Sequence, residues 1–512
     1  MKSSIKFKNL KTMNLQKKIA ALLAATAASL ALAGTGAAQV TADALLNKLV
    51  QRGILKEDEA EALKNESATN DAGGVKFKLN NAIKNMELFG DLRFRYEYRE
   101  AQFGPETSLK GAYDAANRWR YALRIGVRGD LADDFYYGLR LETSPNERST
   151  WDTLGSAGAS PYYGPFSKSS YGVNIGLAYL GWRPASWLDV SIGRVPQPLY
   201  TTPMVWDSDF TPEGVVEKLK WTVGHADLFA TLGQFVYQDT TPGSGSAILG
   251  GVPGNADNNA YMMAWQAGVN YHINKDVSVK IAPVLYNYIG HGTTNSGSAL
   301  YYGPFVGQGE PNGLQFTSAS TGSSSLPGSA AGSYNQTGLN NLFLFELPGE
   351  VNFKLGSLDA RVFGDFGLNL EGDQRASAAF NSTPAAFPAG AQLGQDKAYQ
   401  AGMAVGNNLG LTSSSAPKKG TWEARAYWQH VEQYALDPNL LDSDFFEGRG
   451  NLEGFYTAFA YSISDAMIGT VRYGWAERID KNLGTGGYNA DLPLPNPVNK
   501  YQIIQVDVTW KF

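Results

Sequence analysis

The chain has 512 residues, of which 43% are hydrophobic, 12% aromatic and only 18% charged, with 57 glycines and a mean hydropathy of −0.26. The aromatic and glycine content excludes a disordered chain, a coiled coil and a collagen-like repeat, and the polarity argues against a helical membrane protein. The absence of cysteine excludes a disulfide framework, thiol catalysis and thiolate metal sites, and the chain has only four histidines. We therefore expect no cofactor and no bound metal.

Residues 1–38 show the three parts of a secretory signal peptide. Six lysines and no acidic residue in 1–18 precede an unbroken apolar run over 19–33, and small residues at 36–38 would precede a cleavage before Gln39. An uncleaved anchor helix is the alternative, but the run is short and alanine-rich for a membrane span. Cleavage would leave 37 basic and 48 acidic residues, a net charge of −11, which argues against a nucleic-acid partner. Export of a cysteine-free chain is typical of a bacterial envelope protein.

Residues 40–66 are the only helix-like segment that the sequence predicts after the signal peptide. Leu45, Leu46, Leu49 and Val50 recur at helical spacing, and Gly53 would end the first of two short helices. Two helices of this size cannot bury a core alone, so they would pack in an oligomer, on the rest of the chain, or on a periplasmic or cell-wall partner. Residues 69–74 follow as a flexible linker.

From residue 86 onward, the hydrophobic period changes from helical to two. In the second such run, Trp119, Tyr121 and Leu123 alternate with Arg118 and Arg120, and this pattern continues along the run. Strands with one apolar and one charged face fit a sheet that has lipid on one side and water on the other. A large soluble β-sandwich would show the same alternation in single strands, so the number and spacing of the strands must decide.

The sequence predicts sixteen strands, joined by connections that alternate between short turns and long loops. Short turns on one rim, long loops on the other and an even strand number describe a sixteen-stranded antiparallel outer-membrane β-barrel that contacts membrane lipid. The domain organisation is then a signal peptide at 1–38, a periplasmic helical segment with its linker at 39–74, and a barrel at 75–512. The predicted strands are 86–100, 117–130, 134–144, 171–184, 187–195, 213–223, 226–238, 260–273, 277–289, 341–355, 357–370, 397–410, 420–434, 451–464, 466–478 and 500–512.

The chain ends in an alternating apolar pattern that includes Trp510 and terminates in Phe512. This ending resembles the signal by which the barrel-assembly machinery recognises bacterial outer-membrane barrels. Trp182 and Trp187 flank one predicted short turn and would lie at the same rim as Trp510. Aromatic rings at one level suit the headgroup layer of a membrane.

If the apolar faces meet lipid, the charged faces line the interior, and a water-filled lumen accommodates neighbouring arginines. We hypothesise that these arginines face acidic groups across the pore; the alternative is that they only solvate the lumen. The predicted pore-lining residues are Arg93, Arg95, Arg99, Arg118, Arg120, Arg124, Arg128, Arg140, Arg361, Arg425 and Arg472.

The segment 196–213 differs from the other loops because it has four prolines, few glycines and an aromatic centre. We hypothesise that it folds inward as a constriction in which Asp207 and Asp209 face the arginines. Packing on the rim or on a neighbouring subunit is the alternative. Five acids in the later loops could bind Ca²⁺, but they lack EF-hand spacing and are interpreted as solvated loop tips: Asp373, Asp396, Asp437, Asp442 and Asp444.

Catalysis inside the barrel is not expected. His430 and Glu432 lie on one face of a predicted strand, but no nucleophile-elbow motif or histidine-centred triad is recognisable in the sequence. The chain is therefore not predicted to be an enzyme, and no catalytic residue is assigned.

The chain resembles the putative porin family, the sixteen-stranded general porins of the Gram-negative outer membrane. The resemblance lies in 45–63 and 89–99, in 117–143 (which begins NRWRYALRIGV), in 177–199, in VWDSDFTPEGV at 205–215, and in the terminal phenylalanine. It implies a water-filled diffusion channel, a homotrimer, and a helical opener on the periplasmic side. It assigns no selectivity residue.

The leading prediction is passive diffusion of small hydrophilic solutes and ions across the outer membrane. A solute-selective channel, for example one for phosphate, is the first alternative, although the acidic loops and the net charge argue against it. A structural barrel whose residues 40–66 tether the outer membrane to the cell wall is the second.

Overall fold

The computed structural model describes residues 82–105, 110–144, 149–155, 172–238, 260–290, 314–315, 335–336, 341–382, 389–413, 415–485, 492 and 497–512. The predicted signal peptide, the helical segment 40–66 and the linker lie outside the described residues. Within the described ranges, no helix has both the length and the apolar character required to cross a membrane.

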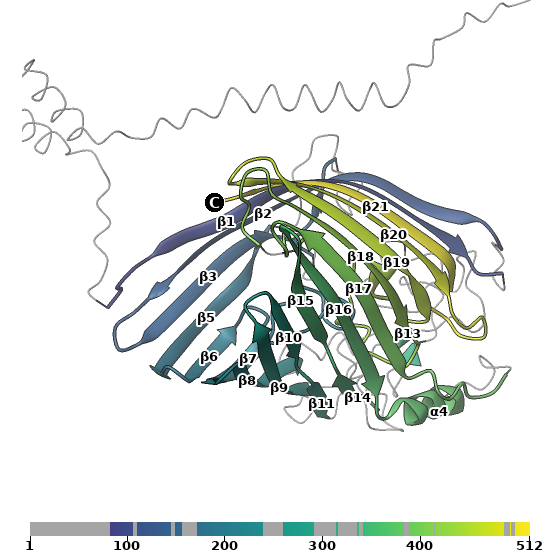
Figure 1. Ribbon diagram of the computed structural model, residues 1–512. Helices are drawn as coiled ribbons and strands as arrows, with labels where there is room; N and C mark the ends of the chain where they lie inside the picture. Colours follow the sequence, from purple (N-terminus) through teal and green to yellow (C-terminus); the bar gives the residue numbers. More distant parts are fainter. Residues whose placement is uncertain are drawn as a thin grey trace, which may run out of the picture. The chain divides into compact units, whose positions relative to one another are not determined.

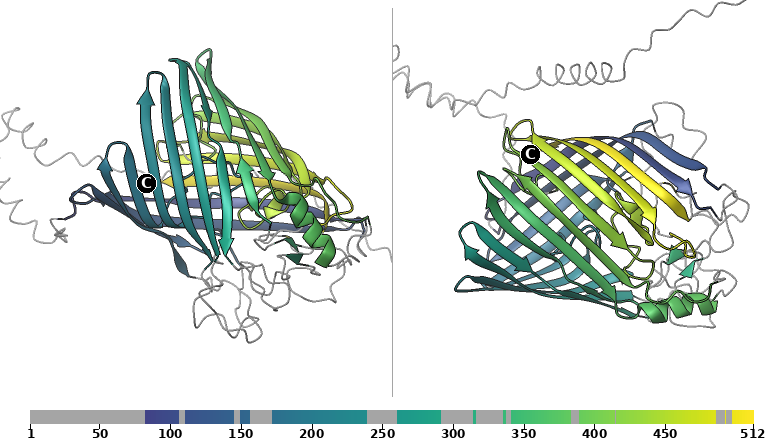
Figure 2. Two further views of the ribbon diagram at one scale, coloured as in Figure 1. Left: turned by 90° about the horizontal axis from the view of Figure 1, so that it is seen from below. Right: turned by 45° about the vertical axis from the view of Figure 1, so that its right-hand side comes forward.

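One antiparallel sheet curls round until its first and last strands meet (Figure 1, Figure 2). β1 pairs with β21 from Asp91 opposite Lys511 to Phe103 opposite Val498, and Gly90 and Phe512 exchange backbone hydrogen bonds of 2.9 and 3.1 Å. Along the wall, each strand pairs with the next one in the chain; β10 and β11 both pair with β9 on one side and with β15 and β14 on the other. The short β4 pairs with β2, and β12 and β13 form a separate two-stranded sheet. The described residues therefore form a closed barrel.

The barrel wall consists of sixteen strands among the described residues, and two of them are each divided into two pieces. The undivided strands are β1 (Glu87–Phe103), β2 (Tyr113–Asp130), β3 (Phe135–Thr143), β5 (Val173–Ala185), β6 (Leu188–Arg194), β7 (Glu213–Val223), β8 (Ala226–Gln238), β9 (Ala260–Asn274), β16 (Leu358–Asn369), β17 (Lys397–Gly406), β18 (Trp422–Val431), β19 (Leu452–Ser462), β20 (Met467–Arg478) and β21 (Val498–Lys511). The divided strands are β10 (Val277–Ile281) with β11 (Val284–Gly290), and β14 (Phe343–Glu346) with β15 (Gly349–Leu355). The predicted strand number is thereby confirmed, with boundaries that differ by a few residues.

Proline explains both interruptions. Pro283 separates β10 from β11, and Pro348 separates β14 from β15. The two interruptions lie side by side in the sheet, since Ala282 N donates to Pro348 O at 3.1 Å. A proline has no N–H to donate to the ladder, so the regular pairing breaks where the two prolines meet. Each predicted strand that contains one of them is continuous in direction but not in hydrogen bonding.

The remaining elements lie in the connections. They are β4 (Asp152–Thr153), β12 (Leu314–Gln315), β13 (Asn335–Gln336), the helix α4 (Gly372–Ser382) and the 3-10 helix η3 (Phe446–Gly448). The sequence did not predict α4, so the expectation that 40–66 is the only helical segment after the signal peptide was wrong. We call the rim that carries the tight turns the short-turn rim; Gly224 and Gly356, at φ of 59° and 65°, supply the left-handed backbone that two of these turns require.

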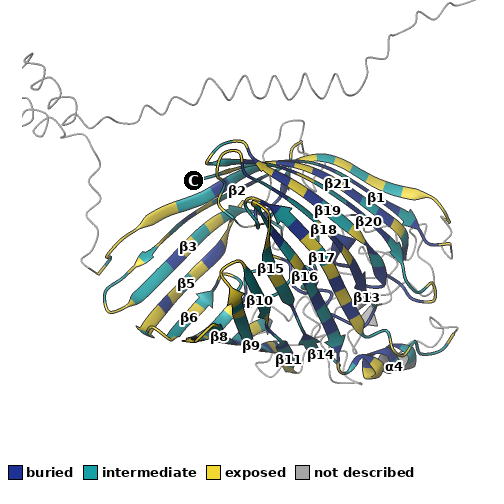
Figure 3. Cartoon of the chain, in the orientation of Figure 1, coloured by how far each residue is buried: buried dark blue, intermediate teal, exposed yellow. Residues whose placement is uncertain are grey.

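Buried and exposed residues alternate along the strands (Figure 3), and many of the exposed ones are large apolar side chains, such as Trp119 and Ile125 of β2. Because the alternate residues face the lumen, these exposed side chains belong to the outer face. Aromatic rings gather at the short-turn rim. Trp187 stacks on Trp221 at a centroid distance of 6.3 Å, and Trp510 contacts Phe512 at 5.1 Å. Trp182 stacks on Phe135 at 5.9 Å. This arrangement is typical of the aromatic girdle of an outer-membrane barrel.

Candidate pore-lining site

Two connections fold into the barrel instead of covering its rim. We name residues 195–212, between β6 and β7, inner loop A, and residues 432–451, between β18 and β19, inner loop B. Inner loop A contacts inward-facing side chains of distant strands: Tyr200 exchanges hydrogen bonds of 2.8 and 2.9 Å with Gln266 of β9, and Thr201 donates to Glu346 of β14 at 2.6 Å. These partners face the interior, so a loop that begins at β6 can reach them only from inside the barrel.

Apolar side chains hold inner loop A in place. Trp206 is 4% exposed and packs on Phe235 and Tyr286, with centroid distances of 6.1 and 6.3 Å, while its indole N–H donates to Phe210 O at 3.1 Å. The inward faces of the strands on this side are apolar as well; Val216 and Met262 belong to the same buried cluster. The expectation that charged faces line the interior therefore does not hold for this part of the wall, because the loop needs an apolar surface on which to pack.

Asp207 joins the two inner loops. Its carboxylate accepts hydrogen bonds from the backbone N–H of Ser443 at 3.0 Å and from the hydroxyl of Ser443 at 2.8 Å, and its N–H donates to Leu440 O at 2.6 Å. Asp207 is 3% exposed, and burial, together with the charge of Asp209, raises its pKa to about 7. Inner loop B therefore supplies a buried partner for Asp207, one of the two acids that the sequence predicts in the constriction.

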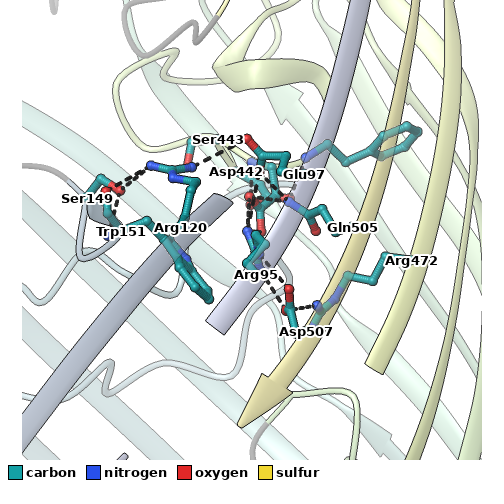
Figure 4. Close-up of polar contacts among 12 residues, drawn as sticks. Arg95, Glu97, Arg120, Ser149, Trp151, Asp442, Ser443, Arg472, Gln505 and Asp507 are labelled. Atoms are coloured by element: carbon teal, nitrogen blue, oxygen red, sulfur yellow. Dashed lines mark hydrogen bonds and ion pairs between the residues drawn. The ribbon is translucent and has the colours of Figure 1, made fainter. Parts of the chain in front are cut away.

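Inner loop B packs on the charged part of the wall (Figure 4). Arg95 binds Asp444 at 3.0 Å and Asp507 at 2.8 Å, and Arg472 binds the same Asp507. Arg99 donates to Ser443 O at 2.8 Å. Although burial opposes ionisation, Arg95 and Arg99 hold the pKa of Asp444 below its usual value. The interpretation of Asp437, Asp442 and Asp444 as solvated loop tips was wrong for Asp437, which is buried, and for Asp444, which is fixed by ion pairs.

Below Asp207 and Ser443, towards the short-turn rim, lies a cavity of 700 Å³. Phe89 and Phe512 line it at that rim, and Ser208 and Asp209 line it where the inner loops begin. Its cationic lining residues are Arg93, Arg95, Arg124, Arg128, Arg140, Arg425, Arg472 and Lys511, and its acidic ones are Glu87, Asp91, Asp207, Asp209, Asp442 and Asp444. The cavity thus brings together seven of the predicted pore-lining arginines and both predicted constriction acids.

The other four predicted arginines lie elsewhere on the inner wall. Arg99, Arg118 and Arg120 gather around Glu97, which is completely buried, while Arg361 lies 3.6 Å from Glu350. Alternation alone could not separate these arginines from the lining ones, since all share the inward face of their strands. Asp91 and Asp507 were identifiable by the same alternation but were not selected; Ser443 and Asp444 have no periodic signal.

Charges in the cavity are nearly balanced. Asp91 binds both Arg93 and Arg124, at 2.7 Å each, and Arg140 binds Glu142 at 2.8 Å. Arg425 instead packs its guanidinium on Phe363, 4.5 Å from the ring centroid. Within the described residues, no group of three or more histidine or acidic side chains has a geometry that could hold a metal ion. The arrangement presents fixed charges of both signs to a polar solute, with no assembled acid–base pair around a nucleophile.

The division of the arginines predicts different effects for two neighbouring residues. Arg124→Ala removes a lining charge, and one charge near a permeating ion is worth about 1 kcal/mol in water, so we expect the K⁺/Cl⁻ permeability ratio to rise by up to about five-fold. Arg120→Ala should leave that ratio unchanged, because Arg120 is buried and donates to Trp151 O at 3.0 Å. Reversal potentials in a salt gradient measure both; equal shifts would contradict this assignment.

A closed barrel with an aromatic girdle, an apolar outer face and a charged inner cavity defines a channel-forming outer-membrane barrel. The chain belongs to the putative porin family, whose model matches residues 105–512. This confirms the resemblance that the sequence showed. Family and fold together indicate a porin channel rather than an enzyme, and an outer-membrane location.

Solved structures with a similar fold include three porin-like proteins. OmpT, an outer membrane protein of Vibrio cholerae, is 9% identical over 86% of this chain and 100% of its own, with a TM-score of 0.38. An anion-selective porin from Comamonas acidovorans is 11% identical over 84% and 99%, with a TM-score of 0.38. A triple mutant of the Rhodopseudomonas blastica porin is 10% identical over 84% and 100%, with a TM-score of 0.35. A search of curated protein sequences returns no match.

Proposed function

We propose that the barrel conducts small hydrophilic solutes and ions by passive diffusion, along a passage between the arginine-rich wall and the two inner loops. The observation that carries this proposal is the 700 Å³ cavity, whose lining holds eight cationic and six acidic side chains. Charged side chains keep such a space hydrated, and opposed charges orient a polar solute without selecting one chemical class.

The acids of the inner loops supply the other side of the passage. Asp209 lies in the cavity with Arg124 and Arg140. Asp207, two residues earlier, also lines the cavity and is held in place by hydrogen bonds from Ser443. Asp507 and Glu142 lie outside the lining but pair with the lining residues Arg95 and Arg140, and with these two the acids number eight against eight cations, so the net field is small. This balance supports a general channel over a phosphate-selective one, in which cations would exceed acids at the narrowest point.

The remaining features of the proposal come from the sequence. Residues 1–38 direct export and are cleaved, the terminal Trp510 and Phe512 are read by the barrel-assembly machinery, and the chain assembles as a homotrimer. A periplasmic or cell-wall partner for residues 40–66 stays a prediction, as does the division of the chain at residues 39 and 75.

Conductance of the purified full-length protein in planar lipid bilayers tests the proposal. In a gradient of KCl we expect steady open channels with a reversal potential near zero, because lining cations and acids nearly balance. A large anion preference that phosphate suppresses would favour the phosphate-selective alternative. A barrel that inserts and stays electrically silent would overturn the channel and favour the tether.

A further inference from the structure

The outer face of β7 carries a carboxylate where its outward neighbours are apolar. Val216 belongs to the same buried cluster as Trp206, so Glu217, the next residue, points outward. It lies four residues from Trp221, which stacks on Trp187 at the short-turn rim. Four strand residues rise about 13 Å, which at a tilt of about 40° places Glu217 about 10 Å above the aromatic girdle, inside an apolar band about 25 Å tall.

Gln234 of β8 accompanies Glu217 on this face. Its side-chain amide donates to a Glu217 carboxylate oxygen at 3.0 Å, while Phe235, the next residue, points inward onto Trp206. On the same face, Leu232 is the cross-strand neighbour of Glu217, and Val215 is that of Gln234. Lipid chains offer no hydrogen-bonding partner to a carboxylate or an amide, so a polar pair at this height indicates contact with something other than lipid.

Other outward carboxylates are placed differently. Glu100, Glu453 and Glu477 lie close to the strand ends away from the short-turn rim, where the headgroup layer is within reach. Glu217 has four residues of β7 before it and six after it. Its position therefore has no such explanation.

We propose that the outer face of β7 and β8 around Glu217 and Gln234 is the surface on which a second copy of this chain docks. All copies in a membrane share one orientation, so an axis relating them runs along the membrane normal and each residue meets residues at its own height. A carboxamide has two N–H donors, and the hydrogen bond from Gln234 to Glu217 uses one of them. The second can donate to Glu217 of the partner subunit, so around a threefold axis each copy donates to the next and the ring closes.

Apolar side chains complete the surface. Leu219, Leu232 and the small Ala230 surround the pair and allow close approach of two barrel walls. The assignment gives the proposed homo-oligomer a specific face. Because this face lies outside the barrel, its assignment does not depend on what crosses the lumen.

Cysteine cross-linking in membranes tests the surface directly, since the chain has no cysteine of its own. Ala230→Cys on β8 and Ala426→Cys on β18 form a matched pair: both point outward, and each lies four residues from the first residue of its strand at the short-turn rim. With a short bismaleimide we expect covalent dimers from Ala230→Cys and monomers from Ala426→Cys. Equal yields, or dimers from Ala426→Cys alone, would overturn the proposal.

A double substitution tests the polar pair itself. Glu217→Leu with Gln234→Leu should reduce the oligomer fraction at least ten-fold in mild detergent while the heat-modifiable barrel band on SDS gels persists. Thr457→Leu, outward on β19, serves as the control and should leave association unchanged. Association that survives the double substitution would overturn the proposal and leave a bound cation as the partner of the pair. Conductance of the same samples separates a loss of association from a failure of the channel function.

Discussion

Replacing Glu97 with glutamine is expected to lower the free energy of unfolding of the barrel by about 3–5 kcal/mol, the usual loss when one partner of a buried ion cluster is removed. Glu97 is fully buried, and four guanidinium groups lie within 3.6 Å of its carboxylate. These belong to Arg95, Arg99, Arg118 and Arg120. Gln505 also donates to Glu97, at 3.0 Å.

The neutral amide would leave an excess of positive charge where water cannot reach it. Asp444 and Asp507 still form ion pairs with Arg95, but Arg118 and Arg120 lose the carboxylate that they contact. Unfolding in guanidinium chloride from lipid vesicles, followed by tryptophan fluorescence, measures the loss. Adding Arg118→Gln to the variant should recover part of the stability, since it removes one of the uncompensated cations.

Glu87→Gln is the matched control on the same strand. Glu87 binds Arg128 at 2.8 Å, but both side chains are about half exposed, and exposed pairs contribute roughly 0–1 kcal/mol. A loss for Glu97→Gln no larger than for Glu87→Gln would mean that water reaches the Glu97 cluster and that inner loop B does not seal it.

Trp206→Ala is expected to release inner loop A from the wall and to open the channel. Truncating a buried tryptophan costs about 3–5 kcal/mol, which changes the ratio of docked to undocked loop by a factor of about 10²–10⁴. In single-channel records, we expect excursions to a larger conductance to become at least about 100-fold more frequent. Replacing 198–210 by a short glycine–serine link should make the larger conductance permanent.

Trp265→Ala provides the control, because Trp265 lies on the outer face of β9 and is 41% exposed. It should leave conductance unchanged. An unaltered conductance in the loop replacement as well would show that inner loop A does not bound the passage, and that the inner surface of the Arg95–Arg124 wall alone limits it.

The strand pattern was predictable because it is local. Apolar and charged residues alternate at consecutive positions, and short turns differ in length and composition from long loops. Both features can be read from the sequence, so sixteen strands could be predicted without tertiary information. The broken ladders at Pro283 and Pro348 required knowing that β10 and β15 are neighbours. The helix α4 was missed because its sequence, rich in alanine and serine, lies within a loop of similar composition.

The amino-acid sequence by itself determined the membrane barrel, its inward arginines and the unusual character of 196–213. Only the tertiary structure decided which arginines meet the cavity and which are sealed around Glu97, because that depends on where inner loop B covers the wall. Asp207 and Ser443 are 236 residues apart, and no periodicity relates them. They are in contact because two loops leave the rim and pack on each other inside the barrel. The burial of Trp206 fixes one loop, and the ion pairs of Asp444 fix the other.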